Sequence, residues 1–148
     1  MSSKYKKRSR NNRSSLVKAV RLVKDSKQPK IITTAISREF NLSDTDKITY
    51  TKAVDQNNNI LEVVNVSYEV RINEEWMTIW RYDSEHGYLN CHMRVSLSNT
   101  AETVTTASVK KKGTPHGWFT WAIDNIKKNY LNYRRGFFKR SKIIDNVY

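Results

Sequence analysis

A chain of 148 residues, of which 38% are hydrophobic, can build one modest core, so we expect a single globular domain. The single cysteine, Cys91, excludes an internal disulfide, and no uncharged apolar segment is long enough to cross a bilayer, which favours a cytoplasmic protein. The formal net charge of +13 points to a polyanionic partner.

The positive charge lies at the two ends of the chain. Residues 1–30 hold 11 basic residues and one acid, residues 31–109 hold 6 basic and 11 acidic residues, and residues 110–148 hold 10 basic and 2 acidic residues. Clustered like charge raises self-repulsion, which a bound polyanion relieves. We therefore favour nucleic acid over a merely solvated basic surface. A membrane surface is the weakest alternative, because the N-terminal arm has no apolar face.

Residues 1–14 are expected to form a basic, intrinsically disordered arm, because they contain too few apolar side chains to bury. The arm supplies six predicted nucleic-acid contacts: Lys4, Lys6, Lys7, Arg8, Arg10 and Arg13. From residue 15 to residue 148 we predict one α+β domain.

Helical spacing marks the first element of that domain. Leu16, Val17, Val20 and Val23 recur near the helical period, which predicts a short helix that Pro29 ends. Residues 30–40 fit either a strand or a helix, and residues 41–46 are expected to form a loop.

Period-two alternation begins at Ile48 and predicts an antiparallel β-meander within about residues 48–109. Polar turns are expected at residues 55–59, at Asn73 and Glu74, and from Asp83 to Gly87. The resulting register places Ile48 opposite Val66, Tyr50 opposite Val64, Val70 opposite Met77, Tyr68 opposite Ile79, Val66 opposite Arg81, Tyr82 opposite Tyr88, Ile79 opposite Cys91, and Met77 opposite Met93. The predicted buried face is Ile48, Tyr50, Val64, Val66, Tyr68, Val70, Met77, Ile79, Leu89, Cys91, Met93 and Val95. In this register Arg81 points toward the apolar side.

The opposite face of the predicted sheet combines aromatic and basic residues. It carries Glu69, Arg71, Trp76, Thr78, Trp80, Tyr82, Tyr88, Asn90, His92 and Arg94. Two interpretations remain open for Trp76 and Trp80. A second layer, such as the segment around residues 31–40, covers them as core, or the rings form a platform on which bases stack beside arginine.

The turn between Trp80 and His92 holds the candidate catalytic residues. Metal-independent RNA cleavage needs a base with a pKa near neutral, an acid and a cation for the phosphate, which His86, His92 and Arg81 or Arg94 would supply. Asp83 lies in the same turn, close enough to converge with a histidine. Under the alternative, Asp83 only starts a hairpin turn that Gly87 ends. The spacing matches no strong metal site, and we expect no metal and no cofactor.

A fifth strand is predicted at residues 102–109, and Lys110, Lys111 and Lys112 follow it. Thr114 and Pro115 then start an amphipathic helix over about residues 115–140. Its apolar stripe is Phe119, Ala122, Ile126, Tyr130, Tyr133 and Phe137. A basic ridge on the remaining face is predicted to contact phosphates: Lys127, Lys128, Arg134, Arg135, Lys139 and Arg140.

The segment from Trp76 to Gly87 reads W-x-T-I-x-R-Y-D-x-x-H-G and is followed by His92. Over about residues 64–140 the chain resembles an uncharacterised family of small archaeal and bacterial proteins, and in outline it is similar to TumE-like toxin proteins of toxin–antitoxin pairs. The latter resemblance implies a toxin that acts on RNA or translation, with an antitoxin partner. The chain departs from the pattern by placing Cys91 before His92 and by adding long basic ends, which suggests recruitment to nucleic-acid binding.

The sequence thus predicts an α+β fold in which a four- to five-stranded antiparallel meander packs on a C-terminal amphipathic helix. The expected function is RNA binding within or beside a ribosomal or other ribonucleoprotein complex, through the arm, Lys110 to Lys112, the helix ridge and the residues Trp76, Trp80 and Arg94. Two alternatives stay open: a small ribonuclease-type toxin, and a DNA-binding accessory or phage-type protein. The expected partners are nucleic acid, RNA more than DNA, and ribosomal or other proteins or an antitoxin; no membrane partner is expected.

Overall fold

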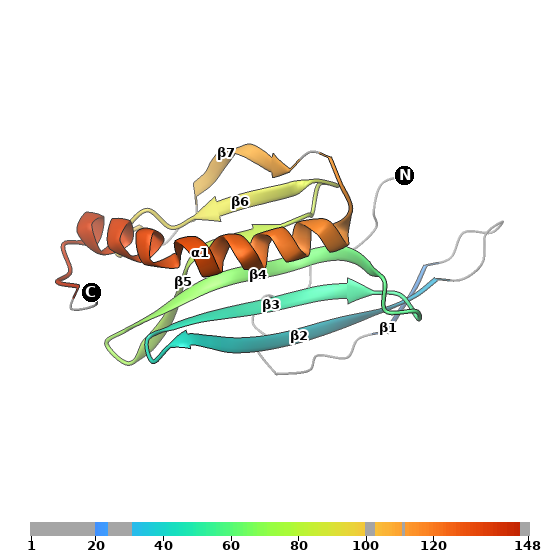
Figure 1. Cartoon of the computed structure of the whole chain (residues 1–148), viewed down its shortest axis with the longest axis horizontal. Coiled ribbons are helices and arrows are strands. Elements are labelled where there is room, and N and C mark those ends of the chain that lie inside the picture. The colour runs from blue at the N-terminus through green and yellow to red at the C-terminus, as the bar shows by residue number, and fades with distance from the viewer. Residues whose placement is uncertain (1–19, 24–30, 100–102, 111, 146–148) are drawn as a thin grey trace.

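The computed structural model describes residues 20–23, 31–99, 103–110 and 112–145. They form one antiparallel sheet of seven strands in the order β1-β2-β3-β4-β5-β6-β7, and one helix. The elements are β1 (Val20–Val23), β2 (Ile31–Ser43), β3 (Asp46–Val54), β4 (Ile60–Ile72), β5 (Glu75–Asp83), β6 (Leu89–Met93), β7 (Thr103–Lys110) and α1 (Pro115–Ser141). Figure 1 shows α1 lying along one side of the sheet, beside β4 to β6.

The α+β architecture and the meander are confirmed, and the number of strands is larger than predicted. The expected sheet began near residue 48, which lies in β3, but β1 and β2 precede that strand. The ambiguous segment is strand β2, which continues to Ser43 through the first part of the expected loop, and Asp44 and Thr45 form the turn into β3. The predicted short helix is wrong at Val20–Val23, which pair with β2 as a strand. Three of the four apolar residues that suggested a helix are valine, a β-branched residue that is favoured in strands. The rest of that segment and the arm lie outside the described residues.

Two of the three predicted turns occur as expected. Residues 55–59 connect β3 to β4, with Asp55 accepting backbone N–H bonds from Asn57 and Asn59 at 2.8 and 3.0 Å. Asn73 and Glu74 connect β4 to β5 with positive φ angles of 50° and 67°, as a two-residue hairpin turn of type I′ requires. The third turn contains Gly87 at φ 81° but is displaced by one residue: Asp83 is the last residue of β5, and residues 84–88 connect it to β6, which begins at Leu89.

Bulges shift the strand register away from the prediction. Between β3 and β4 two irregularities move the pairing by two residues, so that Ile48 pairs with Tyr68 rather than Val66. A shift of two leaves every side chain on its predicted face, except around the bulge, where Val63 rather than Val64 is buried.

A single bulge between β4 and β5 has a larger effect. Val70 pairs with Met77 as predicted, but beyond the irregularity Tyr68 pairs with Trp80 and Val66 with Tyr82. The extra residue is Ile79, and a shift of one residue exchanges the two faces of the strand after it. Tyr82 therefore enters the core at 2% exposure, and Arg81 lies on the opposite face, which corrects the prediction that Arg81 points to the apolar side.

Helix α1 covers the apolar face. Thr114 caps it by accepting the Gly117 N–H at 3.2 Å, and Pro115 occupies the first turn, as predicted. The predicted stripe is confirmed: Ala122, Ile126 and Phe137 are fully buried, and Phe119, Tyr130 and Tyr133 pack against the same core. No helix among the described residues is long and apolar enough to cross a membrane.

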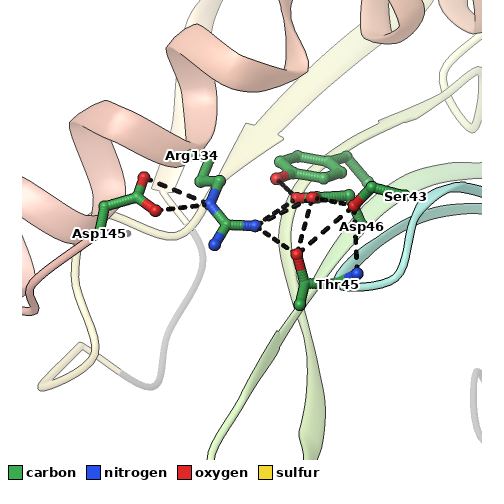
Figure 2. Close-up of polar contacts among 6 residues, drawn as sticks. Ser43, Thr45, Asp46, Arg134 and Asp145 are labelled. Atoms are coloured by element: carbon green, nitrogen blue, oxygen red, sulfur yellow. Dashed lines mark hydrogen bonds and ion pairs between the residues drawn. The ribbon is translucent and has the colours of Figure 1, made fainter. Parts of the chain in front are cut away.

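A buried ion pair attaches α1 to the β2–β3 hairpin (Figure 2). Arg134 Nη1 lies 2.9 Å from Asp46 Oδ2, and its Nε lies 3.0 Å from Asp145 Oδ1. Asp46 also accepts the hydroxyl protons of Ser43 and Tyr68. Because Arg134 is only 5% exposed, the prediction that it belongs to a phosphate-contacting ridge is wrong. It lies on the same side of the helix as Ile126 and Phe137, and therefore faces the sheet.

Candidate functional site

The face of the sheet that lies opposite α1 carries a cluster of Arg81, Asp83 and His92. Tyr82, which lies between Arg81 and Asp83, donates a hydrogen bond to Asn125 of α1 at 2.5 Å, so its two neighbours in the strand point away from the helix. His92 pairs with Arg81 in the β5–β6 ladder and therefore lies on the same face. The bulge at Ile79 and the true β5–β6 register together assemble this group.

Asp83 is the centre of the cluster. Its Oδ2 accepts a hydrogen bond from Arg81 Nη1 at 2.7 Å and lies 2.8 Å from His92 Nε2. The histidine contact has the distance of an ion pair without the alignment of a hydrogen bond, since among the described residues Nε2 has no hydrogen-bond partner. Asp83 Oδ1 accepts the Glu85 N–H at 3.3 Å, so the same carboxyl group also starts the turn, as the structural alternative proposed.

The electrostatics of the cluster keep Asp83 ionised. Burial by itself would raise the pKa of this carboxyl, but the close contact with His92 Nε2 and the hydrogen bond and positive charge of Arg81 outweigh burial and lower the pKa to about 2. The side chains of Arg81 and Asp83 are 5% and 4% exposed, whereas that of His92 is 15% exposed. His92 is thus the member of the cluster that a solvent-borne ligand reaches most directly.

His86 is placed apart from this cluster. It is exposed in the turn, where its ring lies 6.2 Å from that of Tyr88. The two other nearby candidates for nucleophilic chemistry are engaged in the fold: Ser84 Oγ accepts the Val63 N–H at 2.9 Å, and Cys91 is buried at 2% exposure on the helix side, as predicted. The structure therefore brings together Arg81, Asp83 and His92, and it leaves His86 at the tip of the hairpin.

The aromatic platform predicted on this face does not form as expected. Trp80 lies on the helix side, where it stacks on Tyr133 with 3.8 Å between ring centroids and 6° between ring planes. It belongs to the core, as the covered-layer interpretation held, although α1 rather than residues 31–40 covers it. Trp76 remains half-buried beside Lys47, whose Nζ lies 4.4 Å from the ring centroid.

Arg94, which was predicted to contact nucleic acid, is hydrogen-bonded to the backbone of its own loop. Its Nε donates to the carbonyl of Asn99 at 2.7 Å, and its Nη2 donates to that of Leu97 at 2.8 Å. The guanidinium thereby fixes the loop that follows β6. A cation that already binds several backbone carbonyls has few donors left for a phosphate.

The outward face of α1 is the second candidate site. Four of the predicted ridge residues are exposed and fall on one side of the helix: Lys127, Lys128, Arg135 and Lys139. They span about 18 Å along the axis at about 1.5 Å per residue. Arg140 is also exposed, but it leans over the sheet and donates to the carbonyl of Val95 at 2.6 Å. No acid lies between Asp124 and Asp145 in the sequence.

Sequence reasoning missed Ser67, which pairs with Arg81 of the cluster. Ser67 and Glu69, of which only Glu69 was predicted on this face, are buried there at 2% and 1% exposure. Their signal was a polar residue at every second position of an otherwise apolar strand. Among the described residues, no three His, Cys, Asp or Glu side chains form a group that could hold a metal ion. Of the predicted lysine contacts, Lys112 is exposed, whereas Lys111 and the N-terminal arm lie outside the described residues, as does the side chain of Lys110.

Comparison with known proteins identifies a family for this chain. The model of a domain of unknown function, DUF7718, matches residues 35–143, which include β3 to β7, α1 and both candidate sites. Neither a curated protein nor a solved structure matches the chain.

Proposed function

Because this chain belongs to the DUF7718 family, a domain of unknown function, we propose its function from its own surface: a cytoplasmic protein that binds RNA phosphates along α1. The observation that carries this proposal is the exposed basic face of the helix. Lys127, Lys128, Arg135 and Lys139 are exposed with no acid among them, and Lys127 lies at the edge of this face, where its Nζ is 5.2 Å from the ring centroid of Phe40. Ion pairs with Asp46 and Asp145 remove Arg134 from this face, so the basic character of the surface rests on the exposed residues.

RNA rather than DNA is proposed as the partner because the surface is a continuous convex helix with flexible cations. Such a surface contacts the backbone and does not present a row of side chains that would read base edges. A ribosomal or other ribonucleoprotein complex is the setting that suits backbone recognition of structured RNA. Tighter binding of duplex DNA than of RNA at matched salt would instead favour the DNA-binding alternative.

The helix face can be tested by neutralising three of its cations. We expect the triple variant K128Q/R135Q/K139Q to bind RNA on the order of 100-fold more weakly at 0.1 M salt, because each lost phosphate contact removes a slope of about 0.7 in log–log salt dependence. Fluorescence anisotropy over a salt series measures both the affinity and the slope, which should fall by about 2.

A matched control removes the same charge from the sheet. The variant R38Q/K52Q/R71Q has the same net charge as the helix variant but keeps the basic face of α1. It should bind RNA within a few-fold of the wild-type protein. Equal losses in the two triple variants would show that net charge alone, and not the helix face, determines binding.

The Arg81–Asp83–His92 cluster supports a second candidate function, the ribonuclease-type toxin suggested by the TumE-like resemblance. An ionised Asp83 favours the histidine tautomer with its proton on Nε2, which leaves Nδ1 free to take a proton from a ribose 2′-hydroxyl. Arg81 would then be a positioning residue for Asp83. This cluster and the basic face of α1 lie on opposite sides of the sheet, so an RNA bound on α1 does not reach His92.

That separation makes the two candidate functions distinguishable. If the cluster cleaves RNA, we expect H92Q to lower the cleavage rate by about 10²- to 10⁴-fold, the usual contribution of general acid–base catalysis, while RNA binding by α1 stays unchanged. The exposed H86Q serves as the matched control and should cleave like the wild-type protein. A loss of cleavage in H86Q equal to that in H92Q would restore the two-histidine scheme predicted from the sequence. Cleavage that stops in the presence of a chelator would contradict metal-independent chemistry.

A further inference from the structure

A hollow of about 420 Å³ lies where the C-terminal end of α1 meets the loop after β6. It is lined by Leu97, Ser98, Arg140, Ser141 and Lys142. This volume lies within the range of small-molecule sites. Neither the Arg81–Asp83–His92 cluster nor the ion pair of Arg134 contributes a residue to it.

The walls of the hollow are fixed by hydrogen bonds. The Leu97 N–H donates to Ser141 Oγ at 2.7 Å, which joins the loop to the last turn of α1. Arg94 also fixes this loop, because its guanidinium donates hydrogen bonds to the carbonyls of Leu97 and Asn99. On the other side, the Ile143 N–H donates to the carbonyl of Phe138 at 2.9 Å and closes the helix end. The shape therefore exists before any ligand binds, which lowers the entropic cost of binding.

The lining combines an apolar surface with cations at its edge. Leu97 supplies an aliphatic side chain, Ser98 and Ser141 supply hydroxyls, and the exposed Arg140 and Lys142 supply positive charge. Lys139, the last residue of the basic helix face, lies one turn before Lys142, whose N–H donates to the Lys139 carbonyl at 3.2 Å. A strand that follows the helix face thus arrives at the hollow with its backbone beside further cations.

We propose that this hollow receives one unpaired RNA nucleotide, with its base against Leu97 and its phosphate beside Arg140 and Lys142. The inference rests on the proposed binding of RNA along α1 and adds a preference for single-stranded segments. Bases in a duplex are stacked and paired, so they cannot leave the helix to enter a hollow without losing those contacts, whereas bases in loops and at ends can turn outward. Ser141 Oγ accepts the Leu97 N–H, and Ser98 Oγ is hydrogen-bonded to Ser96 Oγ at 2.9 Å. Each hydroxyl keeps the capacity for a further hydrogen bond, to the edge of the base or to the ribose.

The test fills the hollow without changing charge. We expect S98L to weaken binding of a single-stranded RNA on the order of tenfold, the scale of one lost base contact, and to leave binding of a duplex RNA of equal length unchanged. N99L is the matched control, because Asn99 is exposed on the same loop and does not line the hollow. It should bind both RNAs like the wild-type protein. Fluorescence anisotropy measures the affinity of the wild-type protein, S98L and N99L for each of the two RNAs.

The outcomes separate this inference from the proposed function. If S98L and the wild-type protein bind single-stranded RNA equally while duplex RNA still binds, the hollow does not bind a nucleotide. The proposal that RNA binds along α1 would be unaffected by that result. If the wild-type protein binds neither RNA, the proposed function itself fails. A loss of S98L affinity for both RNAs alike overturns the single-strand preference. Independently, a single-stranded RNA that carries photoreactive uridines should crosslink to residues 97–98 of the wild-type protein, and crosslinks confined to α1 would also overturn the inference.

Discussion

Replacement of Arg134 by methionine is expected to lower the free energy of unfolding by about 3–5 kcal/mol, the usual cost of removing one partner from a buried ion pair. Asp46 is fully buried and contacts Arg134 Nη1 with both carboxyl oxygens, at 3.0 and 2.9 Å. Without the guanidinium, this carboxylate would be left in the interior with only neutral hydroxyl donors. Urea-induced unfolding followed by circular dichroism measures the change.

The adjacent arginine offers a matched control. Arg135 is exposed and bonds to Asn132 of its own helix at 3.1 Å, so R135M should change the free energy of unfolding by no more than about 0.5 kcal/mol. The same substitution at consecutive positions thus separates a buried ion pair from a surface cation. A cost below about 1 kcal/mol for R134M would show that the pair with Asp46 contributes little to stability.

The burial of Arg134 could have been read from the sequence. Its position continues the run of Ile126 and Tyr130 at intervals of four residues and precedes Phe137 by three, so it lies on the apolar stripe. The prediction of a basic ridge grouped the basic residues by their number along the helix, and this did not distinguish the position of Arg134 from that of Arg135. Helical phase, rather than charge density, separates the buried arginine from the exposed one.

The strand register shows where prediction from the sequence ends. Alternation and turn residues correctly located the hairpins at residues 55–59 and at Asn73 and Glu74, because these signals are local. The bulge at Ile79 has no comparable local signal. It depends on which cross-strand packing between β4 and β5 is most favourable, and it moves Trp80 into the core and Arg81 to the polar face. One extra residue in β5 therefore places Arg81 in the candidate site and removes Trp80 from the face where the aromatic platform was predicted.

Asp83 is expected to make stability depend on acid pH. Its pKa is lowered from 3.8 to about 2 in the folded protein, so the folded state holds the proton less tightly than the unfolded state does. The resulting stabilisation is fully present above pH 4 and is lost as the pH falls from about 4 to about 2. It amounts to about 2 kcal/mol, at about 1.4 kcal/mol per pKa unit. Unfolding curves measured at pH 7, 4 and 2 follow the loss.

The variant D83N isolates this contribution from those of other carboxyl groups that titrate in the same range. At pH 7 it should be about 3 kcal/mol less stable than the wild-type protein, because Arg81 and His92 then face each other without an anion between them. Between pH 4 and pH 2 the difference between the two proteins should narrow by about 2 kcal/mol, since only the wild-type protein loses the Asp83 charge. D124N, which changes an exposed carboxyl group, should lose stability in parallel with the wild-type protein.

A difference in stability between D83N and the wild-type protein that stays constant from pH 4 to pH 2 would mean that the Asp83 carboxylate does not titrate as the cluster geometry requires. A strongly ionised Asp83 is also the condition under which His92 can work as a base, so this measurement bears on the second candidate function as well as on the fold.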